Sequence, residues 1–171
     1  MSRILGAILA GGSARRFGSD KALAQWRGKR LIDWVAEALD AQCESVALCG
    51  REEPGFQCLA DMPEAGLGPL GGLNAALRHA AVNGFTHTMS AGVDAPNLPH
   101  SLGWALGGEG AAIVESQPVI GLWPVAVAGD LSAFLRQGGR SLYGFAERIN
   151  ARRVTLDIAL MNVNQPGDLA G

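Results

Sequence analysis

The fold of this chain is constrained most by a short apolar run, Ile4 to Leu9, and by the glycine-rich stretch that follows it, LAGGSARRFGSDK, which ends at Lys21. The apolar run is typical of a buried strand. Glycines allow positive φ angles and bring backbone N–H groups close to a ligand, so the turn can form a concave anion site. Arg15, Arg16 and Lys21 add positive charge that suits phosphate. The stretch predicts a phosphate-binding loop, and the alternative is an ordinary strand-to-helix loop with solvated arginines.

Two well-known glycine motifs do not match this stretch. A P-loop needs four residues between its glycines and then Gly-Lys-Ser/Thr, whereas a dinucleotide fingerprint needs G-x-G-x-x-G. Here Gly11 and Gly12 are adjacent and a basic pair follows them. The loop therefore predicts neither a P-loop NTPase nor a dinucleotide-binding protein.

The composition predicts one compact domain over residues 1–171. With 48% hydrophobic and 18% charged residues, the chain can bury a sizeable core, and the composition is not that of a disordered segment. A formal net charge of −2 argues against broad binding to nucleic acid or to an anionic membrane. No apolar run has membrane-spanning length, so we expect a cytoplasmic protein. The three cysteines and three histidines lack metal-ligand spacing, which indicates reduced thiols and no zinc site.

Apolar runs of strand length alternate with segments of helical periodicity along the chain. Strands are expected over 4–9, 45–49, 56–60, 85–91, 111–115, 119–123, 153–157 and 161–164. Helices are expected over 31–42, 73–82, 99–106, 128–136 and 141–150, and the glycine- and proline-rich stretch 61–72 is expected to be a loop. This alternation predicts an α/β fold, a three-layer sandwich with a mostly parallel sheet.

Glycine or polar residues follow five of the predicted strands. These residues are Gly11, Gly50, Asp61, Asp94 and Asn164. Ligands of parallel sheets bind beyond the carboxyl ends of the strands, so the five are expected at one edge.

Asp94 is the first candidate for a catalytic group, because its carboxylate at that edge could hold Mg²⁺ together with substrate phosphates. The alternative is a loop aspartate that caps a helix near Pro99, and the residues alone do not separate the two. Asp61 is a second candidate for a ligand-binding carboxylate at that edge, and the alternative is again an aspartate that only stabilises a turn.

Four motifs resemble one family, the nucleotidyltransferases related to molybdenum cofactor guanylyltransferase. They are LAGG-x-x-x-R-F-G-x-D-K, the segment VDAPNLP, the spacing D-x6-GPL that begins at Asp61, and the ending NVNQPGDL. The resemblance implies a Rossmann-like nucleotidyltransferase fold. In that family's arrangement, the GTP site would be lined by Leu9, Ala10, Gly11, Gly12 and Asp61. Lys21 and Arg16 would hold the phosphates, and Asp94 would bind the metal. Asn162 and Asn164 would face the pterin.

The resemblance implies a Mg²⁺-dependent enzyme that transfers GMP from GTP to the molybdenum-pterin cofactor and releases pyrophosphate. Transient contact with proteins that deliver or accept the cofactor would follow. The sequence departs from the family at Gly50, where asparagine is common and contacts the nucleotide, which bears on the choice of base. Three alternatives remain: a related enzyme that uses CTP or a sugar-phosphate acceptor, a non-catalytic nucleotide carrier, and an interaction module.

Overall fold

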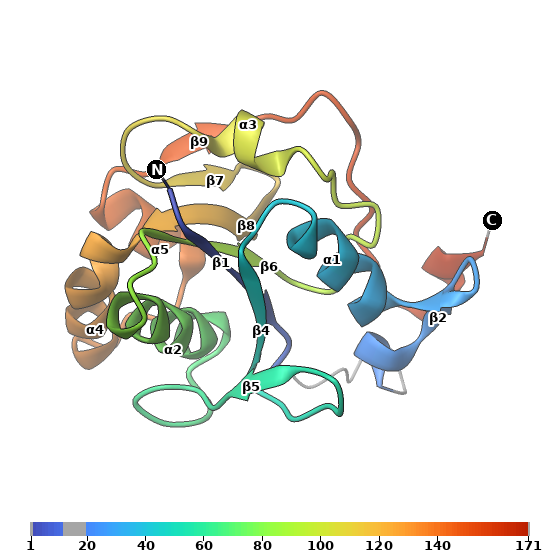
Figure 1. Ribbon diagram of the computed structural model, residues 1–171, viewed down its shortest axis with the longest axis horizontal. Coiled ribbons are helices and arrows are strands. Elements are labelled where there is room, and N and C mark those ends of the chain that lie inside the picture. The colour runs from blue at the N-terminus through green and yellow to red at the C-terminus, as the bar shows by residue number, and fades with distance from the viewer. Residues whose placement is uncertain (1, 12–19, 171) are drawn as a thin grey trace.

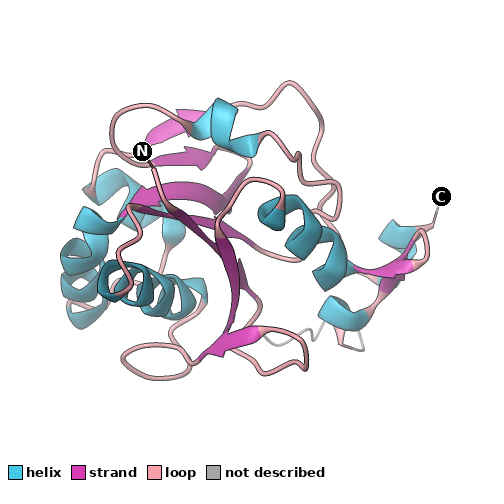
Figure 2. Ribbon diagram, in the orientation of Figure 1, coloured by secondary structure: helices cyan, strands magenta, loops and turns pink. Residues whose placement is uncertain are grey.

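A seven-stranded sheet lies between two layers of helices in the computed structural model, which describes residues 2–11 and 20–170 (Figures 1 and 2). The sheet strands are β1 (Ile4–Leu9), β4 (Ser45–Cys49), β5 (Gln57–Leu59), β6 (His87–Ala91), β7 (Ala112–Val114), β8 (Gln117–Pro124) and β9 (Arg152–Val154). The helices are α1 (Leu31–Asp40), α2 (Pro69–Val82), α3 (Leu102–Leu106), α4 (Ala128–Arg136) and α5 (Leu142–Arg148). Three 3₁₀ turns, η1 (Lys21–Leu23), η2 (Val125–Val127) and η3 (Pro166–Leu169), and a small hairpin of β2 (Gln25–Trp26) and β3 (Lys29–Arg30) complete the described chain.

The strand order is β5-β4-β1-β6-β8-β7-β9, with β1 between two parallel neighbours. Strand β5 is parallel to β4, and β9 is parallel to β7. Strand β8 runs antiparallel to both β6 and β7. The predicted mostly parallel sheet is therefore confirmed, and the carboxyl ends of β4, β1 and β6 meet at one edge.

Each face of the sheet carries its own apolar core. Helices α1 and α3 cover one face, and α2, α4 and α5 cover the other (Figure 1). Strand β1 supplies both cores, because Leu5 and Ala7 point to the α2 side and Ile8 points to the α1 side, all with 0% exposure. A strand buried on both faces reads as a continuous apolar run, which is why Ile4–Leu9 was visible in the sequence.

The expected loop over 61–72 is wrong at its end, since α2 already begins at Pro69. Proline fits the first helical position, where its missing N–H would have no partner. Gly71 and Gly72 lie in the first turn because this turn packs closely on the sheet. A Cβ on Gly72 would stand 3.1 Å from Cys49 Cβ, and one on Gly71 would stand 3.2 Å from Asp61 Cβ. These glycines mark a close approach within a helix.

The strand expected over 161–164 is also wrong, and this segment has no regular structure. Its backbone groups bind side chains and a loop in place of a strand ladder. Gln117 Nε2 donates to the Met161 carbonyl at 2.9 Å, and Val163 N donates to the Asp94 carbonyl at 2.8 Å. The segment resembles a strand in its alternation of apolar and polar residues, but it buries only one side chain completely, Val163, at 0% exposure.

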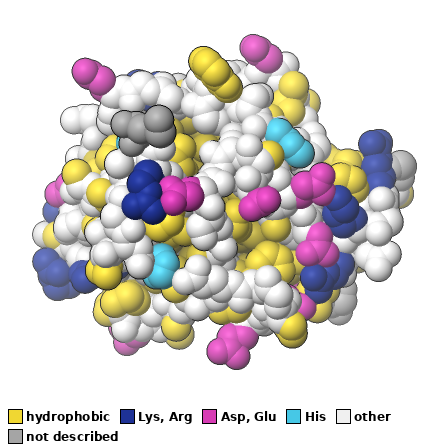
Figure 3. All heavy atoms as spheres, viewed as in Figure 1, with side chains coloured by type: hydrophobic (Ala, Val, Ile, Leu, Met, Phe, Trp, Pro, Cys, Tyr) yellow, Lys and Arg dark blue, Asp and Glu magenta, His cyan; other side chains and the backbone are white. Residues whose placement is uncertain are grey.

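The described surface agrees with the composition. On the face seen in Figure 3, acidic and basic side chains lie interspersed, as the net charge of −2 suggests. Across residues 2–11 and 20–170, none of the helices combines the length and apolarity needed to span a bilayer. Cys43, Cys49 and Cys58 are free thiols, as predicted, and burial raises the pKa of Cys49 to about 12.

Candidate functional site

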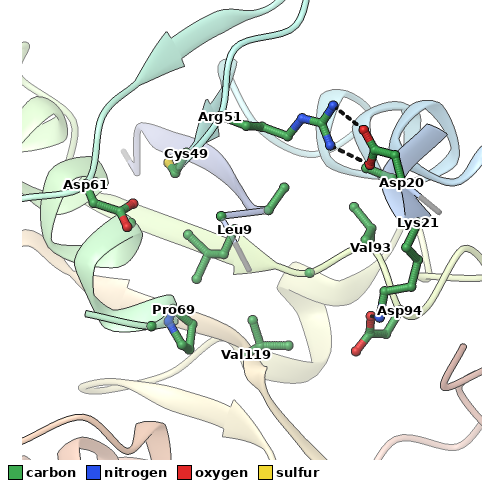
Figure 4. A pocket seen from close by; sticks show the side chains of 16 residues that line it. Leu9, Asp20, Lys21, Cys49, Arg51, Asp61, Pro69, Val93, Asp94 and Val119 are labelled. Atoms are coloured by element: carbon green, nitrogen blue, oxygen red, sulfur yellow. Dashed lines mark hydrogen bonds and ion pairs between the residues drawn. The ribbon is translucent and has the colours of Figure 1, made fainter. Parts of the chain in front are cut away.

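A cleft of about 330 Å³ opens at the carboxyl ends of β1, β4 and β6 (Figure 4). Its floor is the end of β1, from Leu9 to Gly11. Residues beyond each neighbouring strand form its walls, and the start of α2 closes one end. The lining residues are Leu9, Ala10, Gly11, Asp20, Lys21, Ala22, Cys49, Arg51, Asp61, Gly68, Pro69, Gly72, Gly92, Val93, Asp94 and Val119. This volume is within the usual range for small-molecule sites.

Lys21 and Asp94 form an ion pair at one end of the cleft. The distance from Lys21 Nζ to Asp94 Oδ1 is 2.5 Å, and Nζ also donates to the Val163 carbonyl at 3.1 Å. The two side chains are 20% and 34% exposed. An ammonium group has three donors, so the two contacts within the described part of the chain leave one N–H of Lys21 for a ligand. The alternative role for Asp94 was to cap a helix near Pro99. That helix, α3, begins at Leu102 with Ser101 at its N-cap, so the Asp94 carboxylate does not cap it.

Asp61 occupies the opposite end of the cleft, beside Cys49 and Pro69 (Figure 4). Its carboxylate lies against the first turn of α2, where Gly71 leaves room for it. Burial raises the pKa of Asp61 above its ordinary value. A partly desolvated carboxylate at the base of a cleft is a strong acceptor for N–H donors of a ligand.

A second ion pair lies on the β4 side of the cleft. Arg51 donates from both Nη atoms to the Asp20 carboxylate, at 2.7 and 2.8 Å. Arg51 also lies 3.4 Å from Glu53, which binds Arg30 at 2.9 Å. The Arg51 guanidinium holds the pKa of Asp20 below its ordinary value. Asp20 and Lys21 are thus adjacent in the chain but bind partners beyond different strands.

The structure brings most of the predicted nucleotide-site residues into one cleft. Six of them line it: Leu9, Ala10, Gly11, Lys21, Asp61 and Asp94. The other two predicted positions, Gly12 and Arg16, lie outside the described residues. The candidate pterin residues Asn162 and Asn164 are exposed and are not among the described lining residues. Between them, however, Val163 binds both Lys21 and Asp94, so the segment borders the ion-pair end.

Sequence reasoning missed several parts of the site. The pairing of Asp20 with Arg51 was not predicted, although each residue sits at the expected edge of the sheet and they have opposite charges. Cys49, Pro69, Gly72 and Val119 also line the cleft. Cys49 ends a strand, and Pro69 opens a helix beside Asp61, so strand and helix ends were the available signal.

The donor set fits a Mg²⁺ ion that is completed by substrate. The described lining residues carry three carboxylates, Asp20, Asp61 and Asp94, against two cations, Lys21 and Arg51. Among these described residues the carboxylates outnumber the cations, so a bound metal cation would add positive charge that favours a polyphosphate. Among residues 2–11 and 20–170, no cluster of three metal-ligating side chains occurs. Mg²⁺ usually takes one or two carboxylates and fills its other positions with water and substrate phosphates, so a cleft with single, separated carboxylates such as Asp94 is compatible with its coordination chemistry.

Comparison with solved structures defines the class of protein. The chain has the Rossmann-like nucleotidyltransferase fold. The molybdopterin-guanine dinucleotide biosynthesis protein A from Archaeoglobus fulgidus superposes with a TM-score of 0.77 at 25% identity, over 96% of this chain and 94% of that one. The 2-C-methyl-D-erythritol 4-phosphate cytidylyltransferase from Thermus thermophilus gives 0.71 at 16% identity, over 99% and 96%, which is a likeness of fold alone.

Sequence comparison narrows the class to a family. The model of the MobA-like NTP transferase domain matches residues 6–151, and the chain belongs to this family. A molybdenum cofactor guanylyltransferase from Cereibacter sphaeroides is 43% identical over 185 residues, which cover 98% of this chain and 94% of the relative. The family resemblance found in the four sequence motifs is confirmed.

Proposed function

We propose that this protein is a molybdenum cofactor guanylyltransferase, which transfers GMP from GTP to the molybdenum-pterin cofactor and releases pyrophosphate. The near full-length identity of 43% to a relative of that name supports this activity. The observation that carries it in the structure is the Lys21–Asp94 ion pair at one end of a cleft whose other end holds Asp61. We expect the reaction to take place in the cytoplasm.

The two ends of the cleft suit the two parts of the nucleotide. Guanine presents N1–H and N2–H₂ donors, and Asp61 is the carboxylate at the end formed by α2. The backbone of Leu9, Ala10 and Gly11 along the floor would then follow the base and ribose. The phosphates would reach the end where Lys21 and Asp94 lie. In this orientation the acceptor would lie beside the segment 161–164.

Catalysis would depend on positioning and charge. The terminal phosphate of the pterin attacks the α-phosphate of GTP, a new P–O bond forms, and the bond to the β-phosphate breaks as pyrophosphate leaves. Bound Mg²⁺ on Asp94 would neutralise phosphate charge as a Lewis acid. Lys21 supplies a preformed positive charge beside the reacting phosphates, and Arg16 would add another. The protein side chains supply no covalent nucleophile in this scheme.

A pyrophosphate-release assay tests this proposal directly. Each of the four NTPs is supplied with Mg²⁺, with and without the molybdenum-pterin acceptor. We expect release only with GTP and the acceptor together. Equal competition by CTP would favour a cytidylyltransferase, and release with a sugar phosphate would change the acceptor. Nucleotide binding without release under every condition would indicate a carrier.

A further inference from the structure

Asp20 and Lys21 are consecutive residues whose side chains bind two different partners in the cleft, Arg51 and Asp94 (Figure 4). Asp20 accepts two hydrogen bonds from Arg51, which follows β4. Lys21 binds Asp94, which follows β6. Strands β4 and β6 flank β1 on its two sides. The Asp20–Lys21 dipeptide is therefore held by ion pairs to residues that follow the two neighbours of β1.

Of the two ion pairs, Asp20–Arg51 has a more rigid geometry than Lys21–Asp94. A planar guanidinium that binds both oxygens of a carboxylate fixes the relative orientation of the two groups. A lysine ammonium on a flexible side chain can bind a carboxylate in many orientations. Arg51 is itself only 22% exposed and is held by Glu53, at 14% exposure. Glu53 in turn binds Arg30, which precedes α1. Asp20 is thus anchored to a charge network that extends to a core helix.

We propose that Asp20 and Arg51 form a positioning pair, which sets where the Lys21 ammonium lies relative to Asp94 and to the nucleotide phosphates. Asp20 has no reacting atom within this scheme. Its backbone is joined to that of Lys21 by one peptide unit, so a displaced Asp20 displaces the base of the lysine side chain. The inference rests on the proposed function and assigns to Asp20 and Arg51 a role in turnover beyond fold stability.

The first test is a kinetic comparison of Asp20→Asn with the wild-type protein. Asparagine keeps the size of the side chain but loses the charge that holds Arg51. We expect kcat to fall by about tenfold to about a hundredfold with a much smaller change in KM for GTP, because misplacement of a transition-state charge affects chemistry more than binding. Arg51→Lys keeps the charge but loses the bidentate geometry, so it should lower kcat as well. Asp20→Glu should restore part of the rate.

A matched control exists at the other end of β1. Arg3 binds Glu44 through two hydrogen bonds, at 2.9 and 2.8 Å, and these side chains are 46% and 48% exposed. Glu44→Gln breaks this bidentate pair at the amino end of β1, remote from the cleft. We expect its kcat to equal that of the wild-type protein.

The second test follows Lys21 without turnover. Lys21 and Lys29 are the only lysines in the sequence, and each is ion-paired, Lys21 with Asp94 and Lys29 with Glu37. Both can be acetylated with acetic anhydride and quantified by peptide mass spectrometry. In Asp20→Asn the rate at Lys21 should rise severalfold, because its ammonium leaves Asp94 and Val163, while the rate at Lys29 stays constant.

The outcomes separate the inference from the proposed function. A wild-type protein without pyrophosphate release would overturn the function, and labelling would still report on the pair. An active wild type with unchanged kcat and unchanged Lys21 labelling in Asp20→Asn would overturn the inference. Equal losses in Asp20→Asn and Glu44→Gln would also overturn it, since the effect would then be one of general stability. Thermal melting identifies a variant that fails to fold, and Arg51→Lys then decides.

Discussion

Gly50 lies against the backbone of Gly11, so closely that a Cβ on Gly50 would stand 2.6 Å from the Gly11 Cα. Gly50 also has a φ of +87°, a backbone conformation that residues other than glycine rarely adopt. The end of β4 and the floor of the cleft therefore touch through two glycines. Both the positive φ angle and the closeness of the Gly11 backbone favour glycine at position 50.

Gly50→Ala should destabilise the protein by about 1–3 kcal/mol, because both the φ angle and the contact with Gly11 become strained. It should also weaken GTP binding, since Gly11 must move. Gly129→Ala in α4 is the matched control, as its Cβ would have no neighbour within 4 Å. That change should be neutral or stabilising by up to about 1 kcal/mol. Urea denaturation measures both, and equal stability of the two variants would contradict the contact.

Lys21→Ala should lower turnover by at least about a hundredfold, because the variant loses a preformed charge beside the phosphates. The fold should survive, since a partly exposed ion pair contributes about 1 kcal/mol or less. Lys29→Ala, which removes the other lysine, should keep the wild-type rate. Steady-state pyrophosphate release and thermal melting are the measurements. A folded Lys21→Ala protein with near-normal turnover would remove Lys21 from the mechanism.

Asp94→Asn should abolish pyrophosphate release at ordinary Mg²⁺ concentration and regain part of it with excess Mg²⁺ or Mn²⁺. Asparagine keeps one oxygen and the size of the side chain but loses the charge that, under the proposed role, would attract the metal. The unfolding temperature should change little, because the carboxylate is 34% exposed. Metal-titrated turnover and melting on the same sample test this. Loss of stability with full turnover in the cold would show that Asp94 is structural and binds no catalytic metal.

Asp61 should make GTP binding weaken as the pH falls, at a higher pH than an ordinary aspartate would, because burial raises its pKa. Under the proposed role, protonation would convert an acceptor for the guanine donors into a neutral acid. A fluorescent GTP analogue titrated from pH 7 downward measures the dissociation constant. Asp61→Asn should bind GTP at least about tenfold more weakly at pH 7, with a flat profile over the same range.

The same shift predicts the effect of Asp61 on stability. A carboxyl with a folded-state pKa above its unfolded value stabilises the fold below the unfolded pKa, and this contribution is lost as the pH rises through the folded pKa. At pH 7 the ionised Asp61 therefore lowers stability. Asp61→Asn should unfold at an equal or higher temperature than the wild-type protein. A clearly lower melting temperature at pH 7 would mean that the carboxylate is held by stabilising contacts.

The elements that could be predicted are those in which local pattern and final environment agree. The strand 4–9 and the strand 45–49 are buried runs, and they were predicted to the residue. The start of α2 and the segment 161–164 could not be predicted, because close packing on Asp61 and side-chain bonds from Gln117 decide them.

The candidate site divides in the same way. The alternation of strands and helices was enough to predict a mostly parallel sheet. Because Asp61 and Asp94 each follow a predicted strand, both could be placed at one edge of that sheet. The pairing of Lys21 with Asp94 joins residues 73 positions apart and depends on side-chain reach, which no local pattern encodes. The same holds for Asp20 and Arg51, which lie 31 positions apart.

Val163 connects the two halves of the proposed reaction. Its N–H binds the Asp94 carbonyl and its own carbonyl accepts from Lys21, while Asn162 and Asn164 flank it. Under the proposed roles, an acceptor that engages the asparagines displaces the same backbone that holds the metal ligand and the phosphate-binding lysine. Linkage then requires that each substrate alter the affinity of the other by the same factor. Cooperativity between nucleotide and pterin would thus arise from the main chain of one buried valine, whose side chain takes no part in the chemistry.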